Sequence, residues 1–106
     1  MRKVIEEIAV ERQRQIDEEG FDERHDDQFH QQRELSLAAI CYAAPEKIYV
    51  HRCHSDATHL YTDPWPWHAK WDKRDTHDLR RRMIIAASLL VADIERLDRE
   101  REERGE

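Results

Sequence analysis

The spacing of apolar and polar positions predicts a first helix from Val4 to Glu19. Its apolar residues fall largely at helical spacing: Val4, Ile5, Ile8, Ala9 and Ile16. Arg12 and Gln15 continue the same side of the helix, so its second half turns a polar face inward. Gly20 stands where a C-terminal cap is expected, because a residue without a β-carbon enters the left-handed conformation at little cost.

Two further helices are predicted, and a loop separates the first of them from the N-terminal helix. Phe21 to Gln32 is polar and aromatic by turns, and we interpret it as a structured loop. Arg33 to Ala44 carries a stripe of mostly small residues, typical of closely packed helices: Leu35, Ala38, Ala39 and Tyr42. The third helix is expected after an N-cap at Asp75. Its stripe is the longest in the chain and is predicted to form the centre of the core: Leu79, Met83, Ile84, Ala87, Leu90, Val91, Ile94 and Leu97.

Between the second and third helices the pattern breaks down, from Pro45 to Arg74. A stretch of this length is usually functional when it lies within a small domain. Lys47 to Val50 and His59 to Thr62 favour short strands that pair as a minor hairpin. The sequence therefore predicts an all-α fold, a compact three-helix domain with a long ordered aromatic loop. Residues 1–98 form the single domain, and residues 99–106 form a charged tail that frays because it has no apolar residue.

The composition of the chain excludes some classes of function. The chain has 106 residues, enough for one domain, and a formal net charge of −6. An excess of acids argues against binding a nucleic-acid polymer, which needs concentrated basic charge. No apolar run is long enough to cross a bilayer and the N-terminus lacks the pattern of a signal peptide, so we expect a cytoplasmic protein without a membrane partner. Cys41 and Cys53 are then expected to be thiols.

The tryptophans suggest ligand chemistry. Trp65, Trp67 and Trp71 lie within seven positions, beside Lys70 and Lys73. Indole rings stack on bases, and lysines neutralise phosphates. The alternative is that Trp65 and Trp67 fill the core beneath the loop, because Trp is highly buried on average. Trp71, between charged neighbours, is the better candidate for a partly exposed ring.

The polar residues around the first loop leave two interpretations open. Arg12 either bridges to Asp26 or Asp27, or remains free to hold a phosphate. Asp26 and Asp27, with His25 and His30, either bind a divalent ion or ligand hydroxyls, or serve as turn and cap residues. A zinc site is disfavoured because the ligand types have irregular spacing: Cys41, His51, Cys53, His54 and His59. We expect no bound metal and no cofactor.

Several motifs along most of the chain resemble a family of small uncharacterised phage proteins. That family carries ERxRQ, EG with an aromatic, HDD, ELxxAAxCYA, WPW and IERLDR, which begin here at Glu11, Glu19, His25, Glu34, Trp65 and Ile94. Residues 51–62 look like an insertion. The first thirty residues also resemble the ryanodine-receptor repeat, with Phe21 where the repeat has Trp. That resemblance implies binding of adenine nucleotides, with Arg12, Gln15, Asp26, Asp27 and His30 facing the ligand.

A third resemblance, to MazG-like all-α nucleotide pyrophosphohydrolases, is incomplete. Those enzymes hold magnesium with ExxE and ExxD pairs on two helices. Glu34 has Leu37 where the second Glu belongs, although Glu95 and Asp98 show ExxD spacing. With 24 acids in 106 residues, such a pair is expected by chance.

The sequence favours a phage protein that binds and sequesters a small nucleotide-type ligand without catalysis. A host immune signal such as an ADP-ribose derivative or a cyclic nucleotide fits that role. The expected ligand-binding residues are Arg12, Gln15, Phe21, Asp26, Asp27, His30, Tyr42, Trp67, Lys70, Trp71, Lys73 and Arg80. The alternatives are a magnesium-dependent pyrophosphohydrolase and a protein-binding inhibitor of a host factor. We expect a homodimer, because small helical domains often pair through an apolar stripe that remains uncovered.

Overall fold

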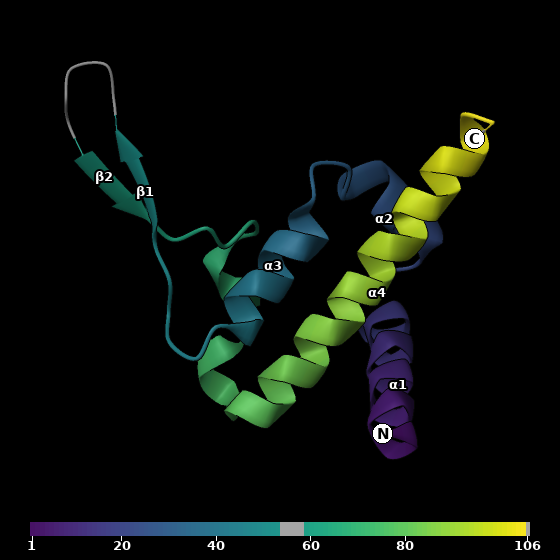
Figure 1. Cartoon of the computed structure of the whole chain (residues 1–106), viewed down its shortest axis with the longest axis horizontal. Helices are drawn as coiled ribbons and strands as arrows, with labels where there is room; N and C mark the ends of the chain where they lie inside the picture. The colour runs from purple at the N-terminus through teal and green to yellow at the C-terminus, as the bar shows by residue number, and fades with distance from the viewer. Residues whose placement is uncertain (54–58, 106) are drawn as a thin grey trace.

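The computed structural model describes residues 1–53 and 59–105, and it shows a mainly α-helical protein with a small two-stranded sheet. The elements in chain order are α1 (Arg2–Glu19), α2 (Glu23–Phe29), α3 (Glu34–Ala43), β1 (Val50–Cys53), β2 (His59–Thr62), the 3-10 turns η1 (Ala69–Trp71) and η2 (Arg74–Thr76), and α4 (Leu79–Glu103). The long helix α4 is central, with α1 and α3 packed along it, and the hairpin stands away from the helices (Figure 1). Within the described residues, no helix combines the length and the apolarity that a bilayer span requires.

The turn after α1 is as the sequence predicts. Gly20 has φ 73, in the left-handed region, and caps the helix by donating its N–H to the carbonyl of Gln15. The following segment corrects the sequence interpretation, because it is not a loop throughout. Residues 23–29 form the helix α2, whose N-cap is Asp22, a side chain that accepts the His25 N–H at 2.9 Å. The chain therefore has four α-helices among its described residues, not the three predicted.

The core lies where α3 meets α4. It contains the small residues that the sequence placed on α3, with Ala38 and Ala39 almost completely buried against Ala86 and Ala92 of α4. Small side chains let the helix axes approach closely. Phe21, Trp65 and Trp67 pack on the edge of this cluster, so part of the aromatic segment completes the core.

The predicted apolar stripe of α4 proved largely wrong. Of its larger members only Ile84 is buried. Five others are exposed: Leu79, Met83, Leu90, Val91 and Ile94. The buried face instead includes Ser88, Asp93 and Arg96. These polar groups have partners inside the fold: Ser88 donates to the carbonyl of Ile8 or Ile84, and Asp93 accepts from Arg96 at 3.0 Å. Apolar periodicity alone cannot anticipate a face whose polar groups are satisfied by other helices.

The N-terminus of α4 also differs from prediction. Asp78 is the N-cap and accepts the Arg81 N–H at 2.8 Å, whereas Asp75 lies in η2. At the other end the helix continues to Glu103, past Leu97. Arg99 binds the carboxylate of Asp27, with Nη2 2.9 Å from Oδ1, which ties this end of α4 to α2. Whether the charged tail frays in solution stays a prediction.

The chain between α3 and α4 includes a hairpin and a buried arginine, Arg74. β1 and β2 pair antiparallel with Val50 opposite Thr62, so the predicted hairpin exists, but its first strand begins at Val50 and not at Lys47. Arg74 is buried and binds both Asp63 and Asp72, at 2.8 and 2.6 Å. Its guanidinium also lies 5.3 Å from the centre of the Trp65 ring. These contacts fix the return of the chain toward α4.

Candidate functional site: an aromatic cavity between α1 and the tryptophan segment

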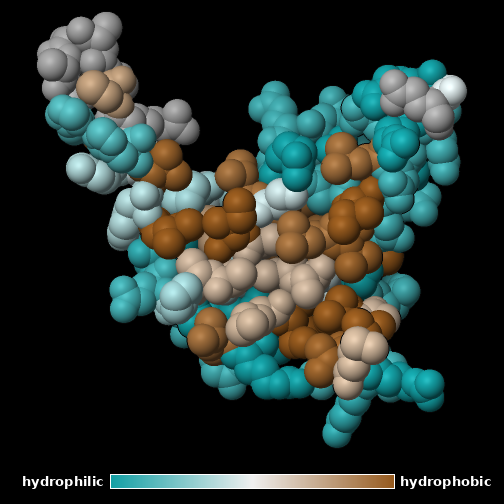
Figure 2. Space-filling model, viewed as in Figure 1, coloured by the Kyte–Doolittle hydropathy of each residue, from teal (hydrophilic) through white to brown (hydrophobic). Residues whose placement is uncertain are grey.

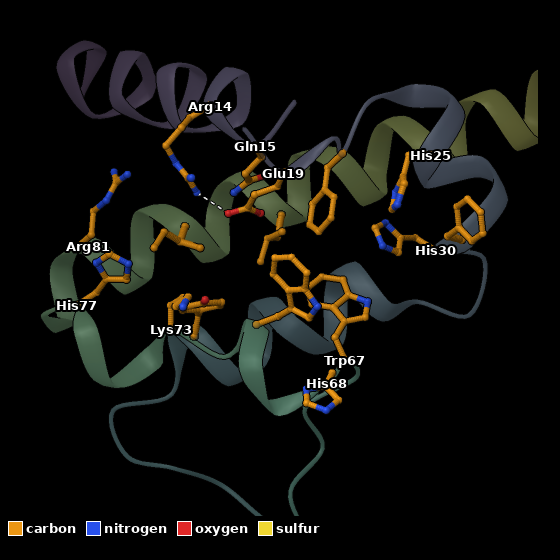
Figure 3. A pocket seen from close by; sticks show the side chains of 16 residues that line it. Arg14, Gln15, Glu19, His25, His30, Trp67, His68, Lys73, His77 and Arg81 are labelled. Atoms are coloured by element: carbon orange, nitrogen blue, oxygen red, sulfur yellow. Dashed lines mark hydrogen bonds and ion pairs between the residues drawn. The ribbon is translucent and has the colours of Figure 1, made fainter. Parts of the chain in front are cut away.

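A cavity of about 690 Å³ opens where the polar side of α1 meets the tryptophan-bearing segment. Pockets for small ligands usually measure roughly 300 to 1,000 Å³. Its walls come from all four α-helices and the aromatic segment: Arg14, Gln15, Glu19, Phe21, His25, Phe29, His30, Tyr42, Trp67, His68, Trp71, Lys73, His77, Arg81, Ile85 and Leu89. Figure 3 shows Lys73, His77 and Arg81 at one end, and His25 and His30 at the other.

One wall of the cavity is aromatic. The Phe21 and Trp67 ring centres lie 5.3 Å apart, and the His30 ring lies 4.9 Å from Phe21 and 5.2 Å from Trp67. Aromatic rings at these separations hold one another in place. Trp71 is 57% exposed, as the sequence predicted for the ring between charged neighbours. The wall therefore offers both a fixed aromatic surface and a ring with room to adjust.

Gln15 lines the cavity and carries an unpaired hydrogen-bond acceptor. The side chain is only 1% exposed, and its Nε2 donates to Oε2 of Glu11 at 3.1 Å. Because a carboxylate can only accept, this bond fixes the orientation of the Gln15 amide. Oε1 is then left buried without a hydrogen-bond partner. A buried acceptor of this kind is rare and favours a ligand that brings an N–H or O–H donor.

Glu11 lies behind Gln15 and holds two of the cations of the cavity. It accepts two hydrogen bonds from Arg14, each at 2.8 Å, and a further ion pair from Arg81 of α4. Burial by itself raises the pKa of Glu11, but the hydrogen bonds from Arg14 and Gln15 and the charge of Arg81 outweigh it, and the pKa is lowered. The carboxylate is thus a charged anchor that joins α1 to α4.

Lys73 is the cation of the wall that remains available. Arg14 also binds Glu18 and Glu19, and Arg81 binds Glu11, whereas Lys73 makes no ion pair among the described residues. Burial raises the pKa of Tyr42, another residue of the wall, so its hydroxyl stays protonated at neutral pH.

The structure brings seven of the twelve predicted site residues to this cavity. They are Gln15, Phe21, His30, Tyr42, Trp67, Trp71 and Lys73. The remaining five are not among the residues that line it: Arg12, Asp26, Asp27, Lys70 and Arg80. Each of these five side chains contacts another group of the protein.

Arg12 and Asp26 follow the structural alternative that the sequence left open. Arg12 Nη2 lies 3.2 Å from Oδ2 of Asp26, and Nη1 donates to the carbonyl of Phe21 at 2.8 Å. Asp26 is completely buried. The pair therefore supports the cavity from behind by holding α1, the Phe21 turn and α2 together.

The other three residues point to different partners. Asp27 binds Arg99, Arg80 binds Glu7 at 2.8 Å, and the Lys70 ammonium lies 5.3 Å from the centre of the Trp71 ring. An ion pair with a distant segment leaves no pattern in the sequence. Sequence reasoning also missed Arg81, whose partner Glu11 is 70 positions away, and Arg14, although Arg14 pairs with Glu11 within α1.

The zinc and magnesium alternatives gain nothing from the structure. In the part of the chain that is described, the group able to hold a metal is His25, Asp26 and His30, and it includes none of the residues of those alternatives. His51 and His59 face each other across the hairpin at 2.7 Å, whereas Cys41 is buried in α3. His54 lies outside the described residues. No disulfide joins Cys41 and Cys53, as predicted for thiols.

Comparison with known proteins adds nothing to this picture: no family model, no curated protein and no solved structure matches the chain.

Proposed function

We propose that this protein binds a small nucleotide-type ligand in the cavity between α1 and the tryptophan segment and sequesters it. The buried Oε1 of Gln15, unpartnered in an aromatic cavity of about 690 Å³, is the observation that supports this most directly. In an empty cavity this acceptor stays unpaired, which is unfavourable. An N–H of a base or a hydroxyl of a ribose would donate a hydrogen bond to it.

The cavity residues divide into three tasks. The rings of Phe21 and Trp67 offer a surface against which a planar base stacks, and Trp71 covers it from the exposed side. Oε1 of Gln15 accepts from a base amine or a sugar hydroxyl. Lys73, at the end where His77 and Arg81 also lie, neutralises phosphate (Figure 3).

The biological role that we propose follows from the resemblance to small phage proteins. A phage protein that removes a host immune signal by tight binding needs a pocket but no bond cleavage. ADP-ribose derivatives and cyclic nucleotides combine a stacking base, hydroxyl donors and phosphate, which are the three features that this cavity addresses. The phage kinship and the identity of the signal stay predictions.

Calorimetric titration against ADP-ribose derivatives, cyclic dinucleotides and ordinary nucleoside triphosphates tests the proposal. We expect saturable binding of at least one class and recovery of that ligand unchanged. Phosphate release that disappears with EDTA would instead favour the hydrolase alternative, and no heat and no melting shift with any ligand would contradict the proposal.

Two lysines of the same segment provide a matched pair of variants. Lys73 lines the cavity and Lys70 does not, although both side chains are exposed. Lys73→Gln is expected to weaken binding about tenfold, since it removes a charge-assisted contact of roughly 1.4 kcal/mol. Lys70→Gln is expected to bind as the wild type does. Equal effects of the two variants would place the phosphate elsewhere.

A homodimer is part of the proposal. Figure 2 shows apolar surface gathered over α3 and α4. The large apolar side chains that these helices expose are Leu37, Ile40, Leu79, Met83, Leu90, Val91 and Ile94. A continuous uncharged surface can meet its own copy across a two-fold axis without opposing like charges, and an area of this kind usually marks an interface.

A further inference from the structure

We propose that His25 and His30 form a binding site for a divalent transition-metal ion at the α2 end of the cavity, with Asp26 positioning His30. The inference goes beyond the nucleotide proposal, because the ion is expected to bind when no other ligand is present.

The three residues come together through the geometry of α2. His25 and Asp26 lie in the second half of its first turn, and His30 is the residue that ends it. One ring nitrogen from each histidine and one oxygen of Asp26 all lie within 4.8 Å of one another. In Figure 3 the His25 and His30 side chains lie next to each other at this end of the cavity. The centres of the two histidine rings are 4.9 Å apart, so the rings need only a small adjustment to hold one ion between them.

Asp26 holds the His30 ring in the form that binds metal. Its Oδ1 lies 2.9 Å from Nδ1 of His30, while its Oδ2 is bound to Arg12. A carboxylate can only accept, so Nδ1 carries the proton and Nε2 keeps its lone pair. Metal-binding histidines very often donate their second nitrogen to a carboxylate in this way, which raises their basicity. Because both oxygens of Asp26 are used, we assign it a positioning role.

His25 contributes the second ligand. Its Nδ1 is buried and has no hydrogen-bond partner, although the ring itself is held by stacking on Phe21 at 5.4 Å and by Phe29 at 5.0 Å. A buried nitrogen without a partner is otherwise unfavourable, and a bound ion satisfies it. Both histidines line the cavity, so the ion would lie at its edge, with space beside it for further ligands.

The donor set determines which ions fit. Two neutral imidazoles suit Zn²⁺, Co²⁺ and Ni²⁺, whereas Mg²⁺ prefers carboxylate and water oxygens. Asp26 adds no net charge here, because Arg12 neutralises it. A site with two nitrogen ligands and open positions is expected to bind these ions in the micromolar range or weaker, and to exchange them readily.

The test is titration of the full chain with Co²⁺ and Zn²⁺ alone, followed by calorimetry and by the visible absorption of Co²⁺. His51 and His59 make a second histidine pair, on the hairpin, so the parent protein carries His51→Ala to remove that pair. In this parent we expect one ion per chain, a Co²⁺ absorption band, and no heat with Mg²⁺. Absence of Zn²⁺ and Co²⁺ binding would overturn the proposal.

Two variants of the cavity histidines locate the ion. His25→Ala removes one ligand from a half-buried position and is expected to weaken Zn²⁺ binding at least tenfold. His68→Ala changes an exposed histidine of the same cavity that is outside the metal-holding group, and is expected to have no effect. Unaltered affinity in His25→Ala, with an unchanged melting temperature in the absence of metal, would place the ion elsewhere. Neither result depends on whether a nucleotide binds.

Discussion

Arg12 of α1 and Asp26 of α2 form a buried ion pair, with 3.2 Å between Nη2 and Oδ2. The pair lies behind the cavity and not in its wall, since neither residue lines it. Arg12 also binds the carbonyl of Phe21, and Asp26 also binds His30, so the pair links α1, the Phe21 turn and α2. Arg12 and Asp26, which the sequence offered as ligand contacts, instead support the cavity from behind.

Breaking this pair is expected to destabilise the fold. Asp26→Asn removes the buried counterion of Arg12 and leaves it the longer contact with the exposed Glu95 carboxylate, at 3.5 Å, a change expected to cost about 3 kcal/mol of unfolding free energy. Urea denaturation followed by circular dichroism measures it. Asp17→Asn, at an exposed position of α1, serves as the control and should change stability by less than about 0.5 kcal/mol. Equal stabilities would show that Arg12 finds another partner.

Gln15→Met is expected to weaken ligand binding while the fold persists. The change removes the unpartnered acceptor but keeps a similar volume, and Glu11 retains its bonds to Arg14. For a ligand found in the nucleotide panel, the affinity should fall about tenfold, the value of one hydrogen bond from a ligand to a buried acceptor. The exposed Gln13→Met variant is the matched control. Unchanged binding would mean that Oε1 does not contact the ligand.

The three tryptophans are expected to separate into two classes. Trp65 packs on the core cluster and lies 5.6 Å from the Tyr42 ring, so Trp65→Ala should cost about 3 kcal/mol of stability. Trp71 is 57% exposed, and Trp71→Ala should cost less than about 1 kcal/mol while it reduces ligand affinity. Thermal melts of both variants measure the two losses of stability. Similar losses of stability would contradict the division.

Acid should unfold the protein through its buried carboxylates. Burial raises the pKa of Asp93, but hydrogen bonds from Ser36, Arg33 and Arg96 outweigh it, so the pKa lies below 3.8, and that of Glu11 lies below 4.5. A lowered pKa gives stability that is complete above the unfolded-state value and is lost as the pH falls through the folded-state value. The melting temperature should therefore be level from about pH 7 to 5 and fall below about pH 4.

Asp93→Asn provides the check on that pH profile. The variant should melt at a lower temperature at pH 7 and should lose less on acidification, because one of the titrating groups is gone. A wild-type melting temperature that stays level down to pH 2.5 would contradict the assignment.

Self-association should depend on the exposed apolar face of α4. Light scattering coupled to size exclusion at several concentrations is expected to show a dimer that dissociates on dilution. Ile94 is 57% exposed, and Ile94→Glu should shift the population toward monomer, because it places a charge within the contact. Leu60→Glu, on the hairpin that stands away from the helices (Figure 1), should have no such effect. A wild-type monomer at all concentrations would contradict the dimer.

The mainly helical character and some local features could be predicted from the sequence, because they depend on neighbours along the chain. The α1 stop at Gly20 needs only a residue tolerant of positive φ, and the small residues of α3 need only the helical period. The inward polar face of α1 was also predictable, since Arg12 and Gln15 continue its apolar side, and both are buried.

Tertiary structure decided which side of α4 is buried and which charges remain for a ligand. Ser88 and Asp93 occupy the inner face with partners on other helices, the Ile8 carbonyl for Ser88 and the Ser36 hydroxyl for Asp93, and Arg81 pairs with Glu11 across 70 positions. Such pairings are set by how α1, α3 and α4 pack together, and the order of residues carries no local signal for them. For the same reason Arg12 lies behind the cavity in a buried ion pair, while Gln15, its neighbour on the same helical face, lines the cavity with its buried acceptor unpaired.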